Sequence, residues 1–325
     1  MNIAILGAGN IANVLACTMN KMDNVNLYAV ASRDIEKAKH FAEGFNIPKY
    51  YGSYEEMLRD DNVELVYIAT PHSHHFEHMK MCIEHNKNIL CEKAFTRNAS
   101  EAQQIINMAH NNNVYVAEAI WTRYMPSRAM INELLESGII GKIHTMTANL
   151  SYVISQNERL IRPELAGGAL LDVGIYCLNF AIMHFGKDID RIESSVQMTD
   201  TGVDGQESIT VFYRDGKMAV LTAGMFARSD RQGIIYGEDG YLVVDNINNP
   251  QLITVYNNED CVILQRSVPP QISGYEYEIE AAIKCILEGK SENTYMPLSE
   301  TKYMMELMDS IRKQWGMKYP GEELR

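Results

Sequence analysis

The first twelve residues constrain the fold more than any other stretch. An apolar run over residues 3–6 leads directly into the motif Gly-Ala-Gly-Asn-Ile-Ala at residues 7–12, and a helical pattern of apolar residues follows as far as Met19. A strand, a glycine turn and a helix in this order are typical of a dinucleotide site: the first glycine permits the sharp turn and the second lets the backbone approach a pyrophosphate. The helix start offers unpaired N–H groups to phosphate. We therefore expect four residues here to bind a dinucleotide: Gly7, Gly9, Asn10 and Ile11.

The end of the second expected strand, over residues 26–31, indicates which dinucleotide binds. Ser32 and Arg33 lie at its tip, and Asp34 follows. An acidic residue at this tip binds the ribose 2′-hydroxyl of NAD, whereas an arginine accommodates the 2′-phosphate of NADP. Asp34 also fits the N-cap of a helix over residues 35–44. Ser32 and Arg33 thus favour NADP, and NAD is the alternative if Arg33 is only a solvated turn residue.

Strands and helices alternate through the first 120 residues. Further strand patterns cover residues 49–51, 65–69, 88–91 and 114–118, and helical patterns cover 54–59, 75–85 and 100–111. This alternation predicts an α/β fold with a Rossmann-type, doubly wound parallel sheet. Ligands bind at the carboxyl ends of the strands in such sheets. Five residues fall at those ends: Gly7, Arg33, Thr70, Lys93 and Glu118.

A different pattern begins at residue 121. A helix over 127–137 precedes strand patterns at 143–153, 189–199, 207–213, 218–227 and 233–237, with a helix over 168–185 among them and two late helices at 275–287 and 299–315. Turn sequences at 214–216 and 238–240 predict hairpins. We expect residues 1–120 to form a dinucleotide-binding domain. Residues 121–325 should form an α+β domain for substrate binding and dimerisation, with a large, mainly antiparallel open sheet.

Length, net charge and cysteine spacing limit the classes of molecule that this protein is expected to bind. A length of 325 residues suits two domains. The net charge of −13 argues against nucleic acid and against an anionic membrane surface. We found no uninterrupted apolar segment of about 18 residues, so no membrane span is expected. Six cysteines without C-x-x-C spacing are typical of reduced thiols, which predicts a cytoplasmic protein. The partner that we expect is a small-molecule substrate.

Four histidines, at positions 72, 74, 75 and 78, raise the question of a metal site. His74 and His78 have the i, i+4 spacing of helical ligands, but a zinc site needs further ligands and an orienting shell. No acidic residue or cysteine stands at ligand spacing. We expect no bound metal, and we place these histidines near the nicotinamide instead.

Three motifs in order resemble the Gfo/Idh/MocA oxidoreductases: G-x-G-x-x-A at residues 7–12, T-P-x-x-x-H at 70–75 and C-E-K at 91–93. Residues 118–126 and 167–177 are similar to the branch of dimeric trans-dihydrodiol dehydrogenases and NADP-dependent D-xylose 1-dehydrogenases. The resemblance implies a homodimer formed through the open sheet. Two departures are Ala94, which replaces the family's proline, and Tyr176, where much of the family has histidine. Further cofactor-binding residues are expected from these motifs: Thr70, Pro71, His75, Glu92, Lys93, Trp121 and Arg123.

Trp121 and Arg123 are expected to line the ligand-binding cleft. An indole face suits a sugar ring or a planar dihydrodiol, and Arg123 is placed to meet a cofactor phosphate. Packing at a domain interface is the alternative for Trp121.

The chemistry requires a hydride acceptor, which a nicotinamide supplies, and a base for the hydroxyl proton. Free tyrosine and lysine have pKa values of about 10, and an ammonium held beside a phenol lowers the pKa of the phenol. Asp172 stands four residues before Tyr176 on the expected helix, and so on the same face. We predict Tyr176 as the acid/base, Lys93 as its electrostatic partner and Asp172 as the group that orients the substrate hydroxyl or holds Lys93. The resemblance implies the same trio.

The sequence therefore predicts an NADP-dependent oxidoreductase that acts on a secondary alcohol or hemiacetal of a sugar, cyclic polyol or trans-dihydrodiol. One alternative is an NAD-dependent inositol or sugar dehydrogenase of the same family. A second is a non-catalytic dinucleotide-binding sensor, which would have no need for the proton donors Lys93 and Tyr176.

Overall fold

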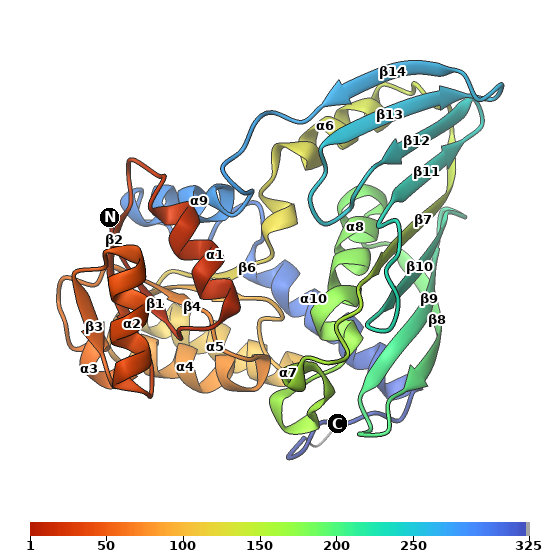
Figure 1. The fold of residues 1–325 in the computed structure, drawn as a ribbon. Helices are drawn as coiled ribbons and strands as arrows, with labels where there is room; N and C mark the ends of the chain where they lie inside the picture. The colour runs from red at the N-terminus through yellow and green to blue at the C-terminus, as the bar shows by residue number, and fades with distance from the viewer. Residues whose placement is uncertain (323–325) are drawn as a thin grey trace. The chain divides into compact units, whose positions relative to one another are not determined.

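The computed structural model describes residues 1–322, which form two compact units (Figure 1). Unit 1 comprises Met1–Tyr124 and Gln271–Met305, and unit 2 comprises Met125–Pro270 and the chain from Glu306 onward. We had placed one boundary after residue 120, and we did not anticipate that residues 271–305 return to unit 1.

Unit 1 is built on a six-stranded sheet in the order β3-β2-β1-β4-β5-β6. All of its neighbouring strands are parallel. The strand order reverses beside β1, where dinucleotides bind in doubly wound sheets. The predicted Rossmann-type fold is confirmed. The strands are β1 (Asn2–Leu6), β2 (Asn26–Ala31), β3 (Lys49–Tyr51), β4 (Leu65–Ile68), β5 (Asn88–Glu92) and β6 (Val116–Ala119).

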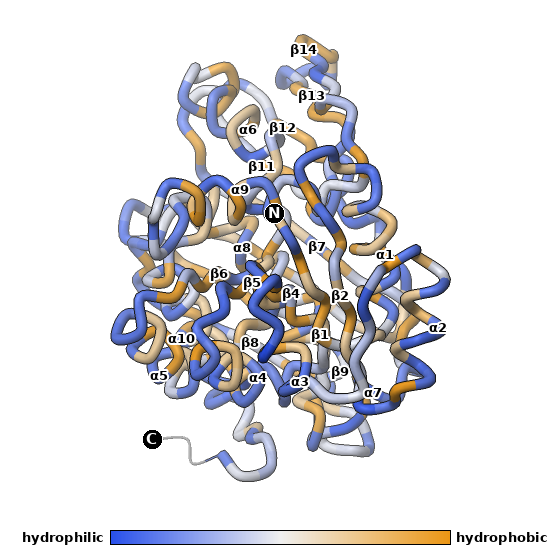
Figure 2. Tube along the Cα trace, turned by 90° about the vertical axis from the view of Figure 1, so that its left-hand side faces the viewer, coloured by the Kyte–Doolittle hydropathy of each residue, from blue (hydrophilic) through white to orange (hydrophobic). Residues whose placement is uncertain are grey.

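The central strands of this sheet are buried because they are apolar along their whole length. Figure 2 shows β1 and β4 as largely apolar, and every residue of β4 is buried. The helices of unit 1 are α1 (Asn10–Met19), α2 (Ile35–Phe45), α3 (Tyr54–Leu58), α4 (His72–Glu84), α5 (Ala99–Asn112) and α9 (Glu276–Leu287), with a 3₁₀ turn, η1 (Trp121–Arg123). α4 begins three residues before its predicted start, directly after Pro71, whose extended backbone ends the preceding segment.

The returning segment completes the core of unit 1. In α9, Ile279, Ala282 and Ile283 are buried in the same cluster as the apolar residues of β1 and α1. The side chains of this late helix therefore cover a sheet whose strands all come from the first 120 residues. α10 (Leu298–Gln314) follows and carries the chain from unit 1 to unit 2.

Unit 2 contains an eight-stranded sheet in the order β14-β13-β12-β11-β7-β10-β9-β8. β7 and β10 are parallel, and the other neighbouring pairs are antiparallel, which confirms the mainly antiparallel sheet. The strands are β7 (Ile143–Ser151), β8 (Ile189–Met198), β9 (Asp204–Tyr213), β10 (Met218–Gly224), β11 (Gly233–Gly237), β12 (Gly240–Val244), β13 (Leu252–Asn257) and β14 (Val262–Ser267). Our prediction stopped at residue 237 and missed the last three strands.

The helices of unit 2 are α6 (Pro126–Glu136), α7 (Glu158–Ile161) and α8 (Ile175–Phe185), with a 3₁₀ turn, η2 (Pro163–Leu165), and a π-helical turn, η3 (Leu170–Gly174). The single helix predicted over 168–185 is thus a π turn followed by an α-helix. The stretch Pro163–Phe185 is long and apolar enough to cross a membrane by length and composition, a feature that our sequence analysis missed, but 94% of its apolar window is buried inside the protein. A helix that is apolar all round and buried in this way serves as a core helix.

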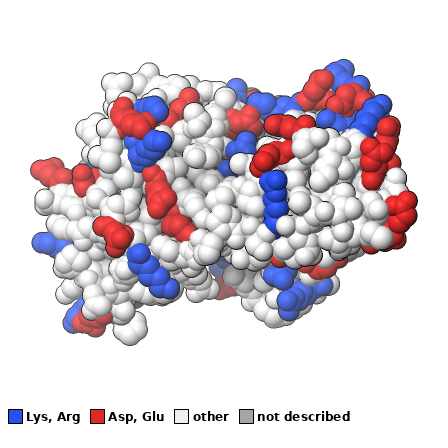
Figure 3. All heavy atoms as spheres, turned by 90° about the horizontal axis from the view of Figure 1, so that it is seen from above, with Lys and Arg blue, Asp and Glu red and all other residues white. Residues whose placement is uncertain are grey.

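Charged side chains of both signs lie close together on the face drawn in Figure 3. Exposed side chains of the protein also form ion pairs, such as Arg191 with Glu193 and Arg214 with Asp190. This face therefore offers a polyanion no extended basic surface among the described residues.

Candidate active site

The glycine turn at the carboxyl end of β1 forms an open cradle at the start of α1. Gly7 has a φ of +105°, and a β-carbon there would lie 2.9 Å from Thr70 Cγ2. Gly9 is the N-cap of α1, with no side chain capping the helix, and a β-carbon there would meet only Ala69 O, at 3.9 Å. Asn10 and Ile11 are the first residues of α1, where N–H groups lack intrahelical partners. This cradle fits a phosphate of a dinucleotide.

The tip of β2 carries Ser32, which is buried, and Arg33, which is exposed. Asp34 is the N-cap of α2, as predicted. Its Oδ1 accepts hydrogen bonds from the backbone N–H groups of Glu36 at 3.0 Å and Lys37 at 3.2 Å. The Asp34 carboxylate is therefore engaged by the start of α2, and the exposed guanidinium of Arg33 precedes it in the chain.

Thr70, Pro71 and His75 lie between the ends of β4 and β5. Both ring nitrogens of His75 contact backbone oxygens at 2.8 Å, Nδ1 with Ala94 O and Nε2 with Thr70 O. The imidazole is fully buried. His75 thus ties the two strand ends together, and its predicted contact with the cofactor stays a prediction.

The other histidines of α4 are also held by neighbours. Thr70 Oγ1 lies 2.9 Å from His78 Nδ1, and the ring of Tyr54 packs edge-on against His78 at 4.8 Å. Burial lowers the pKa of His78 to about 3, which keeps the ring neutral. Within residues 1–322 no cluster of three or more His, Cys, Asp or Glu side chains is arranged to hold a metal ion.

Glu92 and Lys93 stand at the carboxyl end of β5. Glu92 Oε1 accepts a hydrogen bond from the Tyr67 hydroxyl at 2.8 Å, and Glu278 Oε1 of α9 lies at the same distance from that hydroxyl. One phenol has one proton to donate, and the pKa of Glu278 is raised well above its usual range by burial and then by Glu92. Burial and the neighbouring Glu92 therefore favour the protonated form of Glu278. The peptide between Lys93 and Ala94 is cis.

Trp121 and Arg123 contact the returning segment of unit 1. The indole of Trp121 stacks on Tyr275, with ring centroids 4.2 Å apart and planes 9° apart. Arg123 is 1% exposed, and its Nη1 donates to Glu300 Oε2 at 3.2 Å. Packing is thus an observed role for both side chains. Their predicted roles at the cofactor stay predictions.

Asp172 and Tyr176 lie on the η3–α8 segment of unit 2. Arg159 Nη2 of α7 donates to Asp172 Oδ1 at 2.9 Å. Tyr176 is 7% exposed. Because residues 170–174 form a π turn, the α-helical spacing that we used to place both side chains on one face does not apply across the whole interval.

The turn that precedes this segment is tightly packed. Gly168 has a φ of +113°, and a β-carbon there would lie 2.0 Å from Asp204 Oδ1. Asp204 Oδ2 also accepts the Leu170 N–H at the start of η3. On the other side, the buried Tyr319 hydroxyl donates to Gly167 O at 2.6 Å. The catalytic candidates of unit 2 therefore follow a turn whose backbone is held from two sides.

Tyr319 is held in turn by Arg312, a fully buried residue of α10. Arg312 Nη1 donates to Glu322 Oε2 and Nη2 donates to Asp309 Oδ1, both at 2.7 Å. The guanidinium carbon lies 4.6 Å from the centre of the Tyr319 ring. The last described residues of the chain are thus fastened to the turn before Asp172.

The structure divides the predicted site residues between the two units. Most lie at the carboxyl edge of the unit 1 sheet, and Asp172 and Tyr176 lie on one helical segment of unit 2. Five supporting residues escaped the sequence analysis or received no role in it: Tyr67, Glu118, Arg159, Glu278 and Tyr319. Of these, Glu118 had a detectable signal, since it is a carboxylate inside an otherwise apolar pattern.

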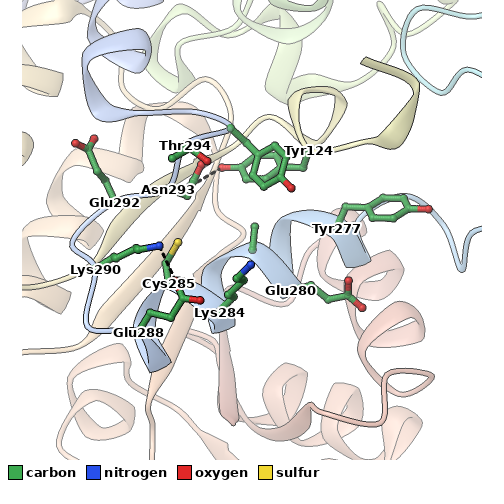
Figure 4. A pocket seen from close by; sticks show the side chains of 12 residues that line it. Tyr124, Tyr277, Glu280, Lys284, Cys285, Glu288, Lys290, Glu292, Asn293 and Thr294 are labelled. Carbon is green, nitrogen blue, oxygen red and sulfur yellow. Dashed lines mark hydrogen bonds and ion pairs between the residues drawn. The ribbon is translucent and has the colours of Figure 1, made fainter. Parts of the chain in front are cut away.

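Two cavities are lined by none of the predicted site residues. One, of about 270 Å³, lies in unit 1 between α9 and residues 288–295 (Figure 4). The Asn293 amide that lines this cavity already has hydrogen-bond partners, because it donates to the hydroxyls of Tyr115 and Tyr124. The other, of about 330 Å³, lies in unit 2 and includes Phe226 and Asp200.

The parallel sheet, its strand order and the open glycine cradle define a dinucleotide-binding oxidoreductase of the Rossmann type. Residues 1–119 match the oxidoreductase family with an NAD-binding Rossmann fold, Gfo/Idh/MocA, and residues 129–243 match the Gfo/Idh/MocA C-terminal domain. The chain belongs to the Gfo/Idh/MocA family of oxidoreductases, which confirms the predicted resemblance, the enzyme class and a nicotinamide dinucleotide as cofactor.

Relatives and solved structures extend this match over nearly the whole chain. The trans-1,2-dihydrobenzene-1,2-diol dehydrogenase of Xenopus tropicalis is 34% identical over 324 residues, covering 97% of this chain and 98% of the relative. The Homo sapiens enzyme of the same name is 30% identical over 301 residues, covering 91% and 90%. A 3-ketoreductase from Actinomadura kijaniata, crystallised with NADP and TDP-benzene, has a TM-score of 0.88 at 22% identity, covering 96% and 97%. The aldose-aldose oxidoreductase of Caulobacter crescentus also has a TM-score of 0.88, at 20% identity, covering 97% and 98%.

Proposed function

We propose that this protein is an NADP-dependent dehydrogenase that acts on a secondary alcohol or hemiacetal. The substrate class is a sugar, a cyclic polyol or a trans-dihydrodiol. The preference for NADP is supported above all by one observation: Asp34 caps α2 through its Oδ1, so Arg33 is the charged side chain left for the adenosine ribose. The substrate class is supported by the names of the relatives, which are dihydrodiol dehydrogenases.

The cofactor preference is tested by replacing Arg33 with alanine. NADP affinity should fall about tenfold or more, because a charge-assisted contact with phosphate is lost, whereas NAD affinity should stay within about twofold. Lys37→Ala is the matched control, since Lys37 is an exposed cation on α2, the helix that follows Arg33. Unchanged NADP preference in Arg33→Ala would favour the NAD-dependent alternative.

The chemistry that we propose uses three side chains. When bound, the nicotinamide accepts a hydride from the substrate carbon. Tyr176 takes the hydroxyl proton in the oxidation direction and returns it in reduction. The Lys93 ammonium favours the phenolate form of Tyr176, and Asp172 orients the substrate hydroxyl. In the structure Asp172 is paired with Arg159, so Arg159 is the neighbour that fixes the carboxylate for this role.

Substrate oxidation by Tyr176→Phe and Lys93→Met tests this mechanism. Loss of one general acid/base group costs a factor of about 10²–10⁴, so Tyr176→Phe should lower kcat by about that range. NADP binding, measured by fluorescence quenching, should be retained. Turnover of D-xylose and trans-1,2-dihydrobenzene-1,2-diol, assayed as NADPH formation, distinguishes the two substrate types. A protein that binds NADP but oxidises neither these nor a panel of cyclitols would fit the sensor alternative.

We also propose a homodimer formed through the outer face of the eight-stranded sheet. Tyr236, Tyr241 and Tyr256 stand on adjacent strands in register, and the Tyr241 and Tyr256 rings stack at 4.9 Å. Tyr236 is 37% exposed. An apolar, aromatic sheet face of this kind is favourable to bury against a second copy. Tyr236→Asp should shift the mass measured by light scattering from dimer to monomer, and Tyr50→Asp, an exposed tyrosine of unit 1, should not.

We also propose a cytoplasmic location, because the cysteines of the chain are unpaired with one another. All six cysteines are free thiols, and all lie within residues 1–322. Free thiols are usual in a reducing compartment. Cell fractionation with an antibody against the protein tests this proposal.

A further inference from the structure

Glu118 is a buried carboxyl beside the loop that carries Lys93, and the mechanism above gives it no part. It lies on β6, at the carboxyl edge of the unit 1 sheet, and is 1% exposed. Its Oε1 accepts the backbone N–H of Phe95 at 3.1 Å. Phe95 is two residues beyond Lys93, so this hydrogen bond restrains the loop of the proposed catalytic lysine.

The same loop is held from its other side by His75. Nδ1 of His75 contacts Ala94 O at 2.8 Å, and Nε2 ties the ring to the end of β4. The peptide group between Ala94 and Phe95 thus meets two buried side chains, the His75 imidazole at its carbonyl oxygen and the Glu118 carboxyl at its N–H. Between them they fix the backbone of residues 93–95, and so the direction in which the Lys93 side chain leaves the strand.

The strength of the hydrogen bond from the Phe95 N–H depends on whether the Glu118 carboxyl is ionised. A carboxylate that accepts a backbone N–H makes a charge-assisted hydrogen bond, which is roughly twice as strong as the bond made by a neutral carboxyl. Burial raises the pKa of Glu118 to about 7, against the opposing effects of Thr301, the Phe95 N–H, Arg123 and Lys93. Glu118 therefore changes charge near neutral pH.

Several titratable or charged groups face this carboxyl. Lys93 and Arg123 favour its ionised form. The groups with a resolved interaction with Glu118 come from four parts of the chain: Cys91 and Lys93 at the end of β5, Arg123 and Tyr124 after β6, Glu278 on α9 and Thr301 on α10.

We propose that Glu118 is a positioning residue for Lys93, and that turnover rises with pH as the Glu118 carboxyl ionises. The ionised form holds the Phe95 N–H more strongly and stands as a counter-charge to the Lys93 ammonium. The inference rests on the proposed role of Lys93. Beyond that role, it assigns Glu118 a part in positioning: Glu118 touches neither substrate nor cofactor and acts through the loop of residues 93–95.

Glu118→Gln is the decisive variant, because the amide oxygen still accepts the Phe95 N–H but the side chain no longer ionises. We measure kcat/KM for trans-1,2-dihydrobenzene-1,2-diol with NADP from about pH 5 to about pH 9. The wild-type profile should contain an ascending limb centred near pH 7, which Glu118→Gln should lack. On the wild-type plateau the variant should be slower by about tenfold, the equivalent of one charge-assisted hydrogen bond, with KM for NADP unchanged.

Two further variants make the result specific. Glu118→Asp retains an ionisable carboxyl and should restore the limb at a lower plateau, which also covers the case in which the glutamine variant folds poorly. Glu207→Gln is the matched control, since Glu207 of β9 is another buried glutamate with a raised pKa but belongs to unit 2. The ascending limb of the kcat/KM profile of Glu207→Gln should match that of the wild-type protein. Retention of the full limb in Glu118→Gln would overturn the proposal.

A readout without turnover separates this inference from the proposed function. Infrared difference spectra between low and high pH detect protonated carboxyls directly, and one band titrating near pH 7 should disappear in Glu118→Gln. If Tyr176→Phe still turned over substrate, the proposed mechanism would fail while this band remained. If the band persisted in Glu118→Gln, Glu118 would not be the titrating group and the inference would fail by itself.

Discussion

Gly7 and Gly9 precede α1 in unit 1, and Gly167 and Gly168 precede the η3–α8 segment in unit 2. Around Gly9 the protein leaves space, because a β-carbon would meet nothing closer than 3.9 Å. Around Gly167 and Gly168 there is none, since β-carbons there would lie 2.5 Å from Leu160 O and 2.0 Å from Asp204 Oδ1. Packing thus requires the second pair, whereas the space at Gly9 is suited to the close approach of a ligand.

Gly168→Ala should give the largest effect and tests the packing side of this comparison. The new methyl group would meet the Asp204 carboxyl, and the φ of +113° is unfavourable for alanine. We expect a loss of roughly 3 kcal/mol or more in the free energy of unfolding, measured in urea. Gly202→Ala, with a φ of +85° but open space, should cost only about 1 kcal/mol. Equal losses would show that backbone conformation, not packing, governs Gly168.

Asp204→Asn tests the carboxyl that fills the space beside Gly168. Burial raises the pKa of Asp204 to about 6, so the folded protein keeps a proton that the unfolded chain loses near pH 4. The free energy of unfolding should therefore fall as pH rises from about 4 to about 6, by roughly 3 kcal/mol from this group. Asp204→Asn can still accept the Leu170 N–H and should lack this part of the decline. A pH slope equal to that of the wild type would contradict the assignment.

Gly9→Ala tests the ligand side. We expect NADP affinity, measured by titration calorimetry, to fall about tenfold or more while stability changes by about 1 kcal/mol at most. Gly44→Ala on α2 is the control: space is open there, so stability should rise by up to about 1 kcal/mol with unchanged affinity. Retained NADP affinity in Gly9→Ala would remove the distinction between the two glycine pairs.

Tyr319→Phe should give the smallest change and sharpens the comparison in unit 2. It removes the hydrogen bond to Gly167 O, which is worth about 1 kcal/mol. Because that turn leads to Asp172, kcat should also fall, by about threefold. Tyr115→Phe removes a buried hydroxyl contact with Asn293 in unit 1 and should affect stability alone. A kcat loss in both variants would attribute the effect to general destabilisation.

The parallel sheet was readily predicted because its strands are short apolar runs followed by glycine or polar residues. β2 and β3 have the predicted bounds, and Asp34 caps α2 as expected. Of the strands that were missed in unit 2, β14 has no buried residue, so its sequence lacks the alternation that marks a half-buried strand. β12 and β13 do have buried residues, and the prediction did not include them.

The site was predictable only where a motif marks it. The pair Arg159 and Asp172 spans thirteen residues, and Tyr319 and Gly167 are 152 apart, so neither contact has a local signal. The π turn at residues 170–174 is equally invisible to a 3.6-residue period. For these reasons the sequence indicated the candidate catalytic residues and not the neighbours that hold them.

The return of residues 271–305 to unit 1 has a consequence for how the protein is made. Synthesis at the ribosome delivers the six parallel strands within the first 124 residues, but α9, whose Ile279 and Ile283 belong to the same core, emerges only after all eight strands of unit 2. Throughout that interval the nascent sheet displays apolar surface that a chaperone would recognise. The dinucleotide-binding unit begins before unit 2 along the chain, yet its core is completed only after the eight strands of unit 2.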